Sequence, residues 1–154
     1  MNIRELTVGD YVYVSAPQYN GVVGQVIEVL RDGRVSVIIV SQTHEDGQYV
    51  TGSVYTKPLS ELSGIVICLA CVLREFGFTD SDEKGWILAY WFGTDMKLLY
   101  RHDWRKNTAS FRFKTDYRKS YVSISCQYVH ELQNIMRFLT GGELEFEYKK
   151  IYPL

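Results

Sequence analysis

The sequence has little of what a covalently stapled or membrane-spanning protein needs. Its 154 residues include three cysteines and three prolines. The most apolar stretch, residues 65–73, is about half of the ~18 to 20 residues that span a membrane. The first residues also lack the basic and then apolar order of a signal peptide. We therefore expect reduced thiols, no disulfide framework, no membrane segment and a cytoplasmic protein.

An excess of charge of one sign is missing as well. The formal net charge is -1, from 17 basic and 18 acidic residues. This balance excludes a nucleic-acid binder that is basic throughout. Positive charge that binds nucleic acid could only be concentrated in single segments of the chain. A hydrophobic content of 46% and an aromatic content of 14% are enough to fill a core without staples.

The short motifs of the recognisable catalytic classes are absent too. The sequence has no Gly-x-Ser-x-Gly elbow, Walker loop, His-Glu-x-x-His pair or dinucleotide fingerprint. Its three histidines, His44, His102 and His130, fall in separate segments, where we expect surface and capping hydrogen bonds. Cys68 and Cys71 have the spacing of half a zinc site, but no second pair exists and apolar neighbours favour core packing. We predict no catalytic residue, no cofactor and no metal ligand.

The first part of the chain has the pattern of short antiparallel strands. Alternating or β-branched residues, separated by turn residues, predict strands over residues 10–15, 22–30, 34–40 and, in two pieces, 48–56. Asp32-Gly33 is a hairpin turn between two of them. Gly24 lies inside a predicted strand, which is typical of a bulge or a bend where another part of the chain approaches closely.

The spacing of these glycines and valines resembles the KOW motif and its SH3-like barrel, known from ribosomal and transcription-elongation proteins. The resemblance rests on Gly9-Asp10, Gly21, Gly24, Val26, Val29, Val35 and Val37. It implies an SH3-like small β-barrel over residues 1–57. Family members that bind RNA use basic loop residues, whereas residues 1–60 here carry four bases and six acids, a net charge of -2. This departure favours a scaffold or protein-binding role for the barrel.

Residues 58–154 are predicted to form a second domain, an antiparallel sheet with two helices. The Pro-, Ser- and Gly-containing residues 57–64 are the predicted joint. The expected elements are a helix from about Cys68 to Phe76, strands at 86–92, 96–101, 109–115 and 120–126, an amphipathic helix at 127–139, and a charged edge strand at 143–151. The predicted fold class is therefore α+β: the SH3-like barrel followed by this sheet and its helices.

A second resemblance covers nearly the whole chain. The segment from Tyr128 that reads Tyr-Val-His-Glu-Leu-Gln-Asn, with Pro58-Leu-Ser-Glu-Leu-Ser-Gly-Ile and Leu73-Arg-Glu-Phe-Gly-Phe, is similar to a group of small uncharacterised proteins of Bacteroides-type gut bacteria and their phages and mobile elements. The resemblance implies a cytoplasmic setting and a mobile-element origin, and no activity. The group usually has a proline and a threonine cap after the Gly-Ile, where this chain has Val66-Ile67-Cys68.

The strongest local charge lies in residues 97–119, with eight bases and two acids, a net charge of +6. Aromatic residues are interleaved with the bases, as on surfaces that bind single-stranded nucleic acid. The candidate partner-binding residues are Tyr100, Arg101, His102, Trp104, Arg105, Lys106, Arg112 and Lys114. A sheet with Phe111 and Phe113 in the core and Arg112 and Lys114 in water would give the same alternation without a ligand.

Together these features predict a non-catalytic binding or adaptor protein that contacts a protein or nucleic-acid partner through residues 97–119. Two alternatives stay open. One is a small hydrolase or nuclease without a recognisable motif, using His102 and Asp103. The other is a structural assembly protein, which would show a large apolar interface.

Overall fold

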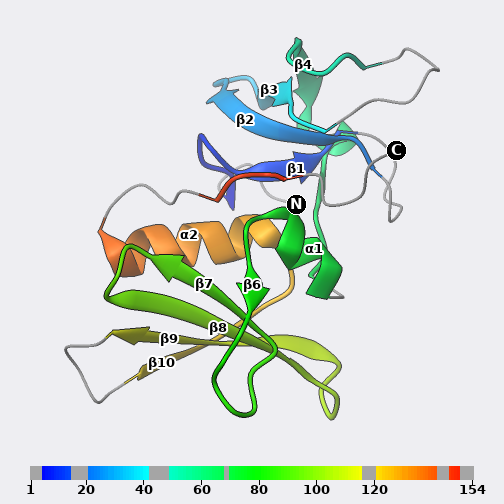
Figure 1. The fold of residues 1–154 in the computed structure, drawn as a ribbon. Helices are drawn as coiled ribbons and strands as arrows, with labels where there is room; N and C mark the ends of the chain where they lie inside the picture. The colour runs from blue at the N-terminus through cyan, green and yellow to red at the C-terminus, as the bar shows by residue number, and fades with distance from the viewer. Residues whose placement is uncertain are drawn as a thin grey trace. The chain divides into compact units, whose positions relative to one another are not determined.

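The computed structural model describes residues 5–14, 21–41, 49–67, 70–115, 121–141 and 146–149. These residues form two antiparallel sheets and two α-helices, which is the mixed α+β class that the sequence predicts (Figure 1). The chain divides into two compact units. The first comprises Met1–Val66 and Tyr128–Glu145, and the second comprises Ile67–Gln127 and Phe146–Leu154.

The first unit contains a five-stranded sheet in the order β4-β3-β2-β1-β5. Its strands are β1 (Tyr11–Tyr13), β2 (Val23–Val29), β3 (Arg34–Ile39), β4 (Val54–Pro58) and β5 (Ser63–Gly64), with a 3-10 helix at Leu59–Glu61 between the last two. The first three strand predictions are confirmed within the described residues. Residues 48–56 supply one strand of the two predicted, and β5 takes the remaining place because its residues pair with Val12 and Tyr13.

The predicted closure of this unit into a barrel is not shown. Each strand pairs only with its neighbours in the order β4-β3-β2-β1-β5. No pairing between the edge strands β4 and β5 is present in the described part of the chain. The edge strand β5 has only two residues, so it offers little backbone for a closing ladder. As far as the described residues go, the five strands form an open sheet.

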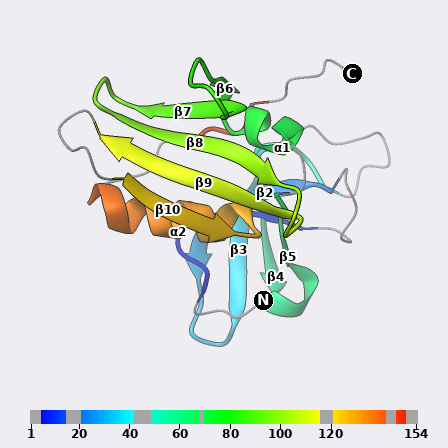
Figure 2. The same cartoon turned by 90° about the horizontal axis from the view of Figure 1, so that it is seen from below.

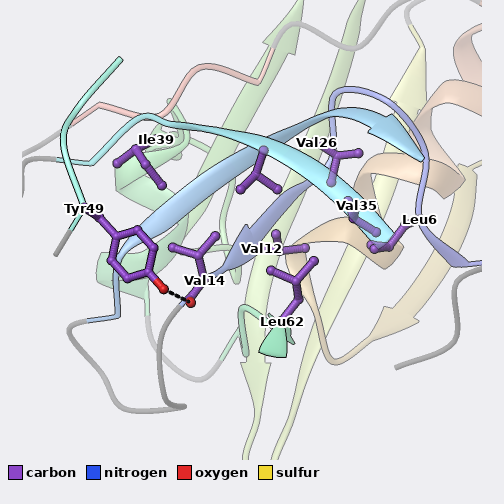
Figure 3. Packing of buried hydrophobic residues seen from close by; sticks show 9 residues of the cluster. Leu6, Val12, Val14, Val26, Val35, Ile39, Tyr49 and Leu62 are labelled. Carbon is purple, nitrogen blue, oxygen red and sulfur yellow. Dashed lines mark hydrogen bonds between the residues drawn. The ribbon is translucent and has the colours of Figure 1, made fainter. Parts of the chain in front are cut away.

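The apolar core of the first unit lies on one face of this sheet (Figure 3). Its buried residues are Leu6, Val12, Val14, Val26, Val35, Val37, Ile39, Tyr49 and Leu62. Gly24 is needed beneath them, because a Cβ there would lie 2.9 Å from Cγ1 of Val14 and 3.1 Å from Cβ of Val37. The pairing of β2 with β3 also shifts register between Val26 and Glu28. The predicted bulge and close approach near Gly24 are both present.

Helix α2 (Val129–Thr140) confirms the predicted amphipathic helix, but it is grouped with the first sheet and not with the second. Gln133 explains this grouping, since its side chain accepts a hydrogen bond from the Tyr11 N–H at 2.9 Å and donates one to the Gly9 carbonyl at 3.0 Å. Arg137 Nη1 also donates to Oδ1 of Asp10 at 2.5 Å. The compact units thus differ from the predicted segments 1–57 and 58–154.

The second unit contains helix α1 (Ala70–Glu75) and a five-stranded sheet in the order β10-β9-β8-β7-β6 (Figure 2). Its strands are β6 (Thr79–Asp80), β7 (Leu88–Phe92), β8 (Met96–Asp103), β9 (Thr108–Thr115) and β10 (Tyr121–Cys126). The four predicted strands are present, and β6 is an addition. Of the strand predicted over residues 143–151, the structure describes residues 146–149. The prediction is wrong for these residues, because they have no strand conformation.

An aromatic core fills one face of the second sheet. Phe111 and Phe113 of β9 are buried, as predicted. The ring of Phe78 lies 6.4 Å from that of Phe111 and 5.4 Å from that of Tyr90, and Tyr90 lies 4.8 Å from Phe146 between ring centroids. Because side chains alternate along a strand, the neighbours of these residues in β8 and β9 belong to the opposite face.

Candidate functional site

The opposite face of the second sheet carries basic side chains from β8 and β9. The register places Lys97 opposite Lys114, Leu99 opposite Arg112, and Arg101 opposite Ser110. Trp91 of β7 lies opposite Lys97, and Tyr121 of β10 lies opposite Lys114, so both rings belong to the same face. We call this surface the cationic face and define it by Lys97, Arg101, Arg112 and Lys114 together with Trp86, Trp91 and Tyr121.

Two arginines of the cationic face stack on one tryptophan. The guanidinium carbon of Arg101 lies 4.6 Å from the centroid of the Trp86 ring, and that of Arg112 lies 5.0 Å from it. Arg112 also lies 3.7 Å from the Tyr121 ring centroid. Such cation–π contacts hold a guanidinium in place and leave its N–H groups available to an acceptor.

These two guanidinium groups lack an anionic partner in the part of the chain that the structure describes. Neither Arg101 nor Arg112 forms an ion pair there, and Nε of Arg112 is buried without a hydrogen-bond acceptor. A buried donor without an acceptor is costly, since its desolvation is not compensated. Arg112 is half-buried and Arg101 is exposed, so the arrangement is suited to an anion that accepts from the outer N–H groups of these two arginines.

The two lysines of the cationic face are partnered in a different way. Glu83, in the loop between β6 and β7, forms ion pairs with both Lys97 and Lys114, and the Lys114 contact is 3.1 Å. The hydrogen bond from Lys97 lowers the pKa of the Glu83 carboxyl below its usual value and outweighs the effect of burial. Lys97 also lies 5.0 Å from the centroid of the Trp91 ring. A carboxylate thus already occupies the position between the two ammonium groups.

A tight turn between β8 and β9 carries the loop residues that the sequence singles out. Oδ1 of Asp103 accepts hydrogen bonds from the N–H groups of Arg105 at 3.0 Å and Lys106 at 3.3 Å. The ring of Trp104 is 80% exposed and lies 4.3 Å from that of His102 between centroids. Trp104, Arg105 and Lys106 therefore project from a fixed turn next to the Arg101 end of the cationic face.

The predicted site residues divide between the two faces of the sheet. Arg101, Arg112 and Lys114 lie together on the cationic face. Tyr100 does not join them, because it pairs with Phe111 on the core face and is only 1% exposed. Its ring lies 5.4 Å from that of Phe111, so it packs in the core and has no face for a ligand.

Five residues of the site are missing from the candidates that the sequence predicts: Glu83, Trp86, Trp91, Lys97 and Tyr121. Lys97 lies in the basic segment 97–119 but is not among its predicted contact residues. For Trp91 and Tyr121 a signal exists, since pairing the predicted strands in register places both beside the lysines. For Glu83 and Trp86 there is none, because both lie in a loop without periodicity.

The histidine and cysteine positions give no catalytic or metal constellation that can be recognised in the described ranges. Nε2 of His102 lies 3.1 Å from Oδ1 of Asn107, and Asp103 is engaged in the turn. His130 is 1% exposed, so its predicted surface role is wrong. No group of three or more His, Cys, Asp and Glu side chains able to hold a metal occurs among these residues. His44, Cys68, Asp116, Arg118 and Lys119 lie outside them.

Comparison of the chain with protein-family models, curated proteins and solved structures finds no match. Within the described residues, neither helix has the length and apolar character required to cross a membrane.

Proposed function

We propose that this protein is a non-catalytic binding protein and that its cationic face binds single-stranded nucleic acid. The observation that carries the proposal is the pair of guanidinium groups of Arg101 and Arg112, which stack on Trp86 without a carboxylate partner in the described part of the chain. An ordinary solvated sheet face does not require two arginines to share one ring. A pre-positioned pair of this kind suits phosphate oxygens.

The spacing of the cations supports a polymeric anion. Residues of one face recur every second position along a strand, which places Lys97, Leu99 and Arg101 in rows about 7 Å apart. The Lys97–Lys114 row, Arg112 and Arg101 thus form a line of positive charge along β8 and β9. An extended nucleotide spans one such step, so successive phosphates of one strand can meet successive rows.

Exposed rings beside this line support a single strand over a duplex. Trp91 is 48% and Tyr121 is 51% exposed, and Trp104 extends from the turn at the other end. Bases of a single strand are free to stack on such rings, at ~1 to 3 kcal/mol per base. A duplex keeps its bases stacked inside and would use only the cations.

For the first unit we propose an SH3-like module of the KOW type that acts as a scaffold or protein-binding part. Support comes from the short antiparallel strands in the order β4-β3-β2-β1-β5 and from the register shift between Val26 and Glu28, a bulge of the kind that bends a strand. Its acidic balance argues against nucleic acid as its ligand. A cytoplasmic location and a mobile-element origin belong to the same proposal.

The binding proposal is tested by fluorescence anisotropy with a labelled single-stranded oligonucleotide of about 12 nucleotides. We expect saturable binding at low salt, weakened about tenfold or more in the double variant Arg101→Gln/Arg112→Gln, because each arginine supplies charge-assisted hydrogen bonds. The matched control is Arg31→Gln/Arg34→Gln, which removes the same two positive charges from exposed positions at the β2–β3 turn of the first unit. Equal affinity of all three proteins, or no binding at low salt, would contradict the proposal.

A further inference from the structure

We infer that Lys97 and Lys114 form a second phosphate subsite on the cationic face, and that the carboxylate of Glu83 occupies this subsite until nucleic acid displaces it. The inference rests on the proposed function. In this view the Glu83 carboxylate competes with the phosphates of the nucleic acid for the two lysines, and this competition lowers the affinity for nucleic acid.

The geometry of the subsite comes from two neighbouring strands. Lys97 and Lys114 are directly opposite each other in the β8–β9 ladder. Nζ of Lys114 donates to both carboxylate oxygens of Glu83 at 3.1 Å, and Nζ of Lys97 pairs with Oε1. A carboxylate held by two ammonium groups stands where a phosphate with its several acceptor oxygens would be bound. Lysine binds phosphate as a point charge, so exchange of one anion for the other requires no rebuilt geometry.

The loop that carries Glu83 also carries Trp86. The Glu83 N–H donates to Oγ of Ser81 at 3.0 Å, and the Trp86 N–H donates to the Glu83 carbonyl at 3.1 Å. One short turn therefore places a carboxylate on the lysines and a ring on the arginines. When a phosphate displaces Glu83, it acts on the same turn that positions the Trp86 ring. The lysine pair and the arginine pair on Trp86 are therefore coupled.

Displacement of Glu83 is feasible because its ion pairs are only partly buried. The side chains of Glu83, Lys97 and Lys114 are 27%, 15% and 39% exposed. Water and salt weaken pairs of this kind, and a phosphate of higher charge competes with them effectively.

The test compares two variants that remove one negative charge from neighbouring positions of the loop. Glu83→Gln frees both lysines, whereas Asp82→Asn removes an exposed carboxylate that pairs with neither of them in the described residues. With the same oligonucleotide, we expect Glu83→Gln to bind about three- to tenfold tighter than the parent protein. Its log–log salt slope should stay close to that of the parent, because nucleic acid makes the same phosphate contacts in both proteins once Glu83 is displaced. Asp82→Asn should give a smaller gain with an unchanged slope.

A second measurement on the unmodified protein is independent of how the variants fold. The Glu83 carboxyl is titrated by NMR with and without the oligonucleotide. Its depressed pKa should rise toward the ordinary value when phosphate takes the two lysines, since the hydrogen bond from Lys97 is then lost. An unchanged titration of Glu83 under saturating oligonucleotide overturns the inference.

Failure of the inference can be told apart from failure of the proposed function. If Arg101→Gln/Arg112→Gln weakens binding while Glu83→Gln and Asp82→Asn behave alike, only the displaced-carboxylate subsite is refuted. If the parent protein fails to bind at low salt, or the arginine variant binds as well as the parent, the proposed function falls and the subsite with it.

Discussion

Replacing Arg137 by Met should destabilise the first unit strongly, because Arg137 is the cationic partner of a fully buried carboxylate. Asp10 is 0% exposed, and Oδ1 accepts from Nη1 of Arg137 at 2.5 Å while Oδ2 accepts from the Thr7 N–H at 2.9 Å. Met retains the length and the apolar stem of the arginine but cannot donate. Removing one member of a buried pair typically costs ~3 to 5 kcal/mol, because the other charge stays buried without compensation. That is a large part of the ~5 to 15 kcal/mol available to a domain.

The pH dependence of this effect has a definite sign. Burial already raises the pKa of Asp10 above 3.8, against the lowering effects of the Thr7 hydrogen bond and of Arg137. The folded state therefore holds the Asp10 proton more tightly than the unfolded state, and its contribution to stability is lost as pH rises through the folded pKa. Removal of Arg137 raises that pKa further, so the destabilisation of Arg137→Met should shrink as the pH is lowered from 7 toward the pKa.

Urea unfolding at neutral and acidic pH measures both quantities. The surface control is Arg34→Met, which removes the exposed pair of Arg34 with Asp32 and should change the midpoint little. The double variant Asp10→Asn/Arg137→Met should be more stable than Arg137→Met alone, because it has no buried charge. Equal midpoints for Arg137→Met and Arg34→Met at neutral pH would refute the reasoning.

Further predictions concern packing and the two rings of the basic segment. Gly24→Ala should destabilise the first unit by ~1 to 3 kcal/mol in urea unfolding, since its Cβ would lie 2.9 Å from Cγ1 of Val14 and 3.1 Å from Cβ of Val37; an unchanged midpoint would show that the strands move apart at no cost. Tyr100→Ala should cost ~3 to 5 kcal/mol as a core truncation. Trp104→Ala should leave the unfolding midpoint nearly unchanged but weaken oligonucleotide binding measured by anisotropy, because it removes an exposed stacking ring. A stable Tyr100→Ala variant together with a destabilised Trp104→Ala variant of unchanged affinity would contradict the assignment of faces.

The local elements follow from the sequence, whereas the grouping of α2 does not. Alternation in the β9 segment and the apolar stripe of residues 127–139 identify a strand and a helix without further information. The partners of Gln133 and Arg137, by contrast, are Gly9, Tyr11 and Asp10, more than a hundred positions away. Such polar contacts leave no periodic signal, so residues 127–139 could be predicted as a helix and still be assigned to the other part of the chain.

Composition was misleading at Ser63-Gly64. Their small side chains predict a linker, but the two residues form β5. A Cβ at position 64 would lie 2.6 Å from Cδ1 of Tyr128, so the glycine is required by packing in the first unit. Linker composition and close packing select the same small residues.

The candidate site was predicted in part for a similar reason. Counting charge over residues 97–119 identifies the basic segment but treats it as one surface. Strand alternation assigns Arg101 to the cationic face and Tyr100 to the core, which a segment count cannot separate. The position of Trp86 over Arg101 and Arg112 depends on the path of a loop, for which the sequence offers no pattern.

An NMR titration with a single-stranded oligonucleotide reads the cationic face directly. The Nε–Hε resonance of Arg112 and the indole N–H of Trp86 report on the stacked pair, and the amides of Val12 and Val26 report on the core of the first unit. We predict saturable shifts at low salt for Arg112 and Trp86, which are reversed by added salt, and none of comparable size at Val12 and Val26. Shifts concentrated in the first unit, or no shift of the Arg112 Nε–Hε resonance, would contradict the assignment of nucleic-acid binding to this face.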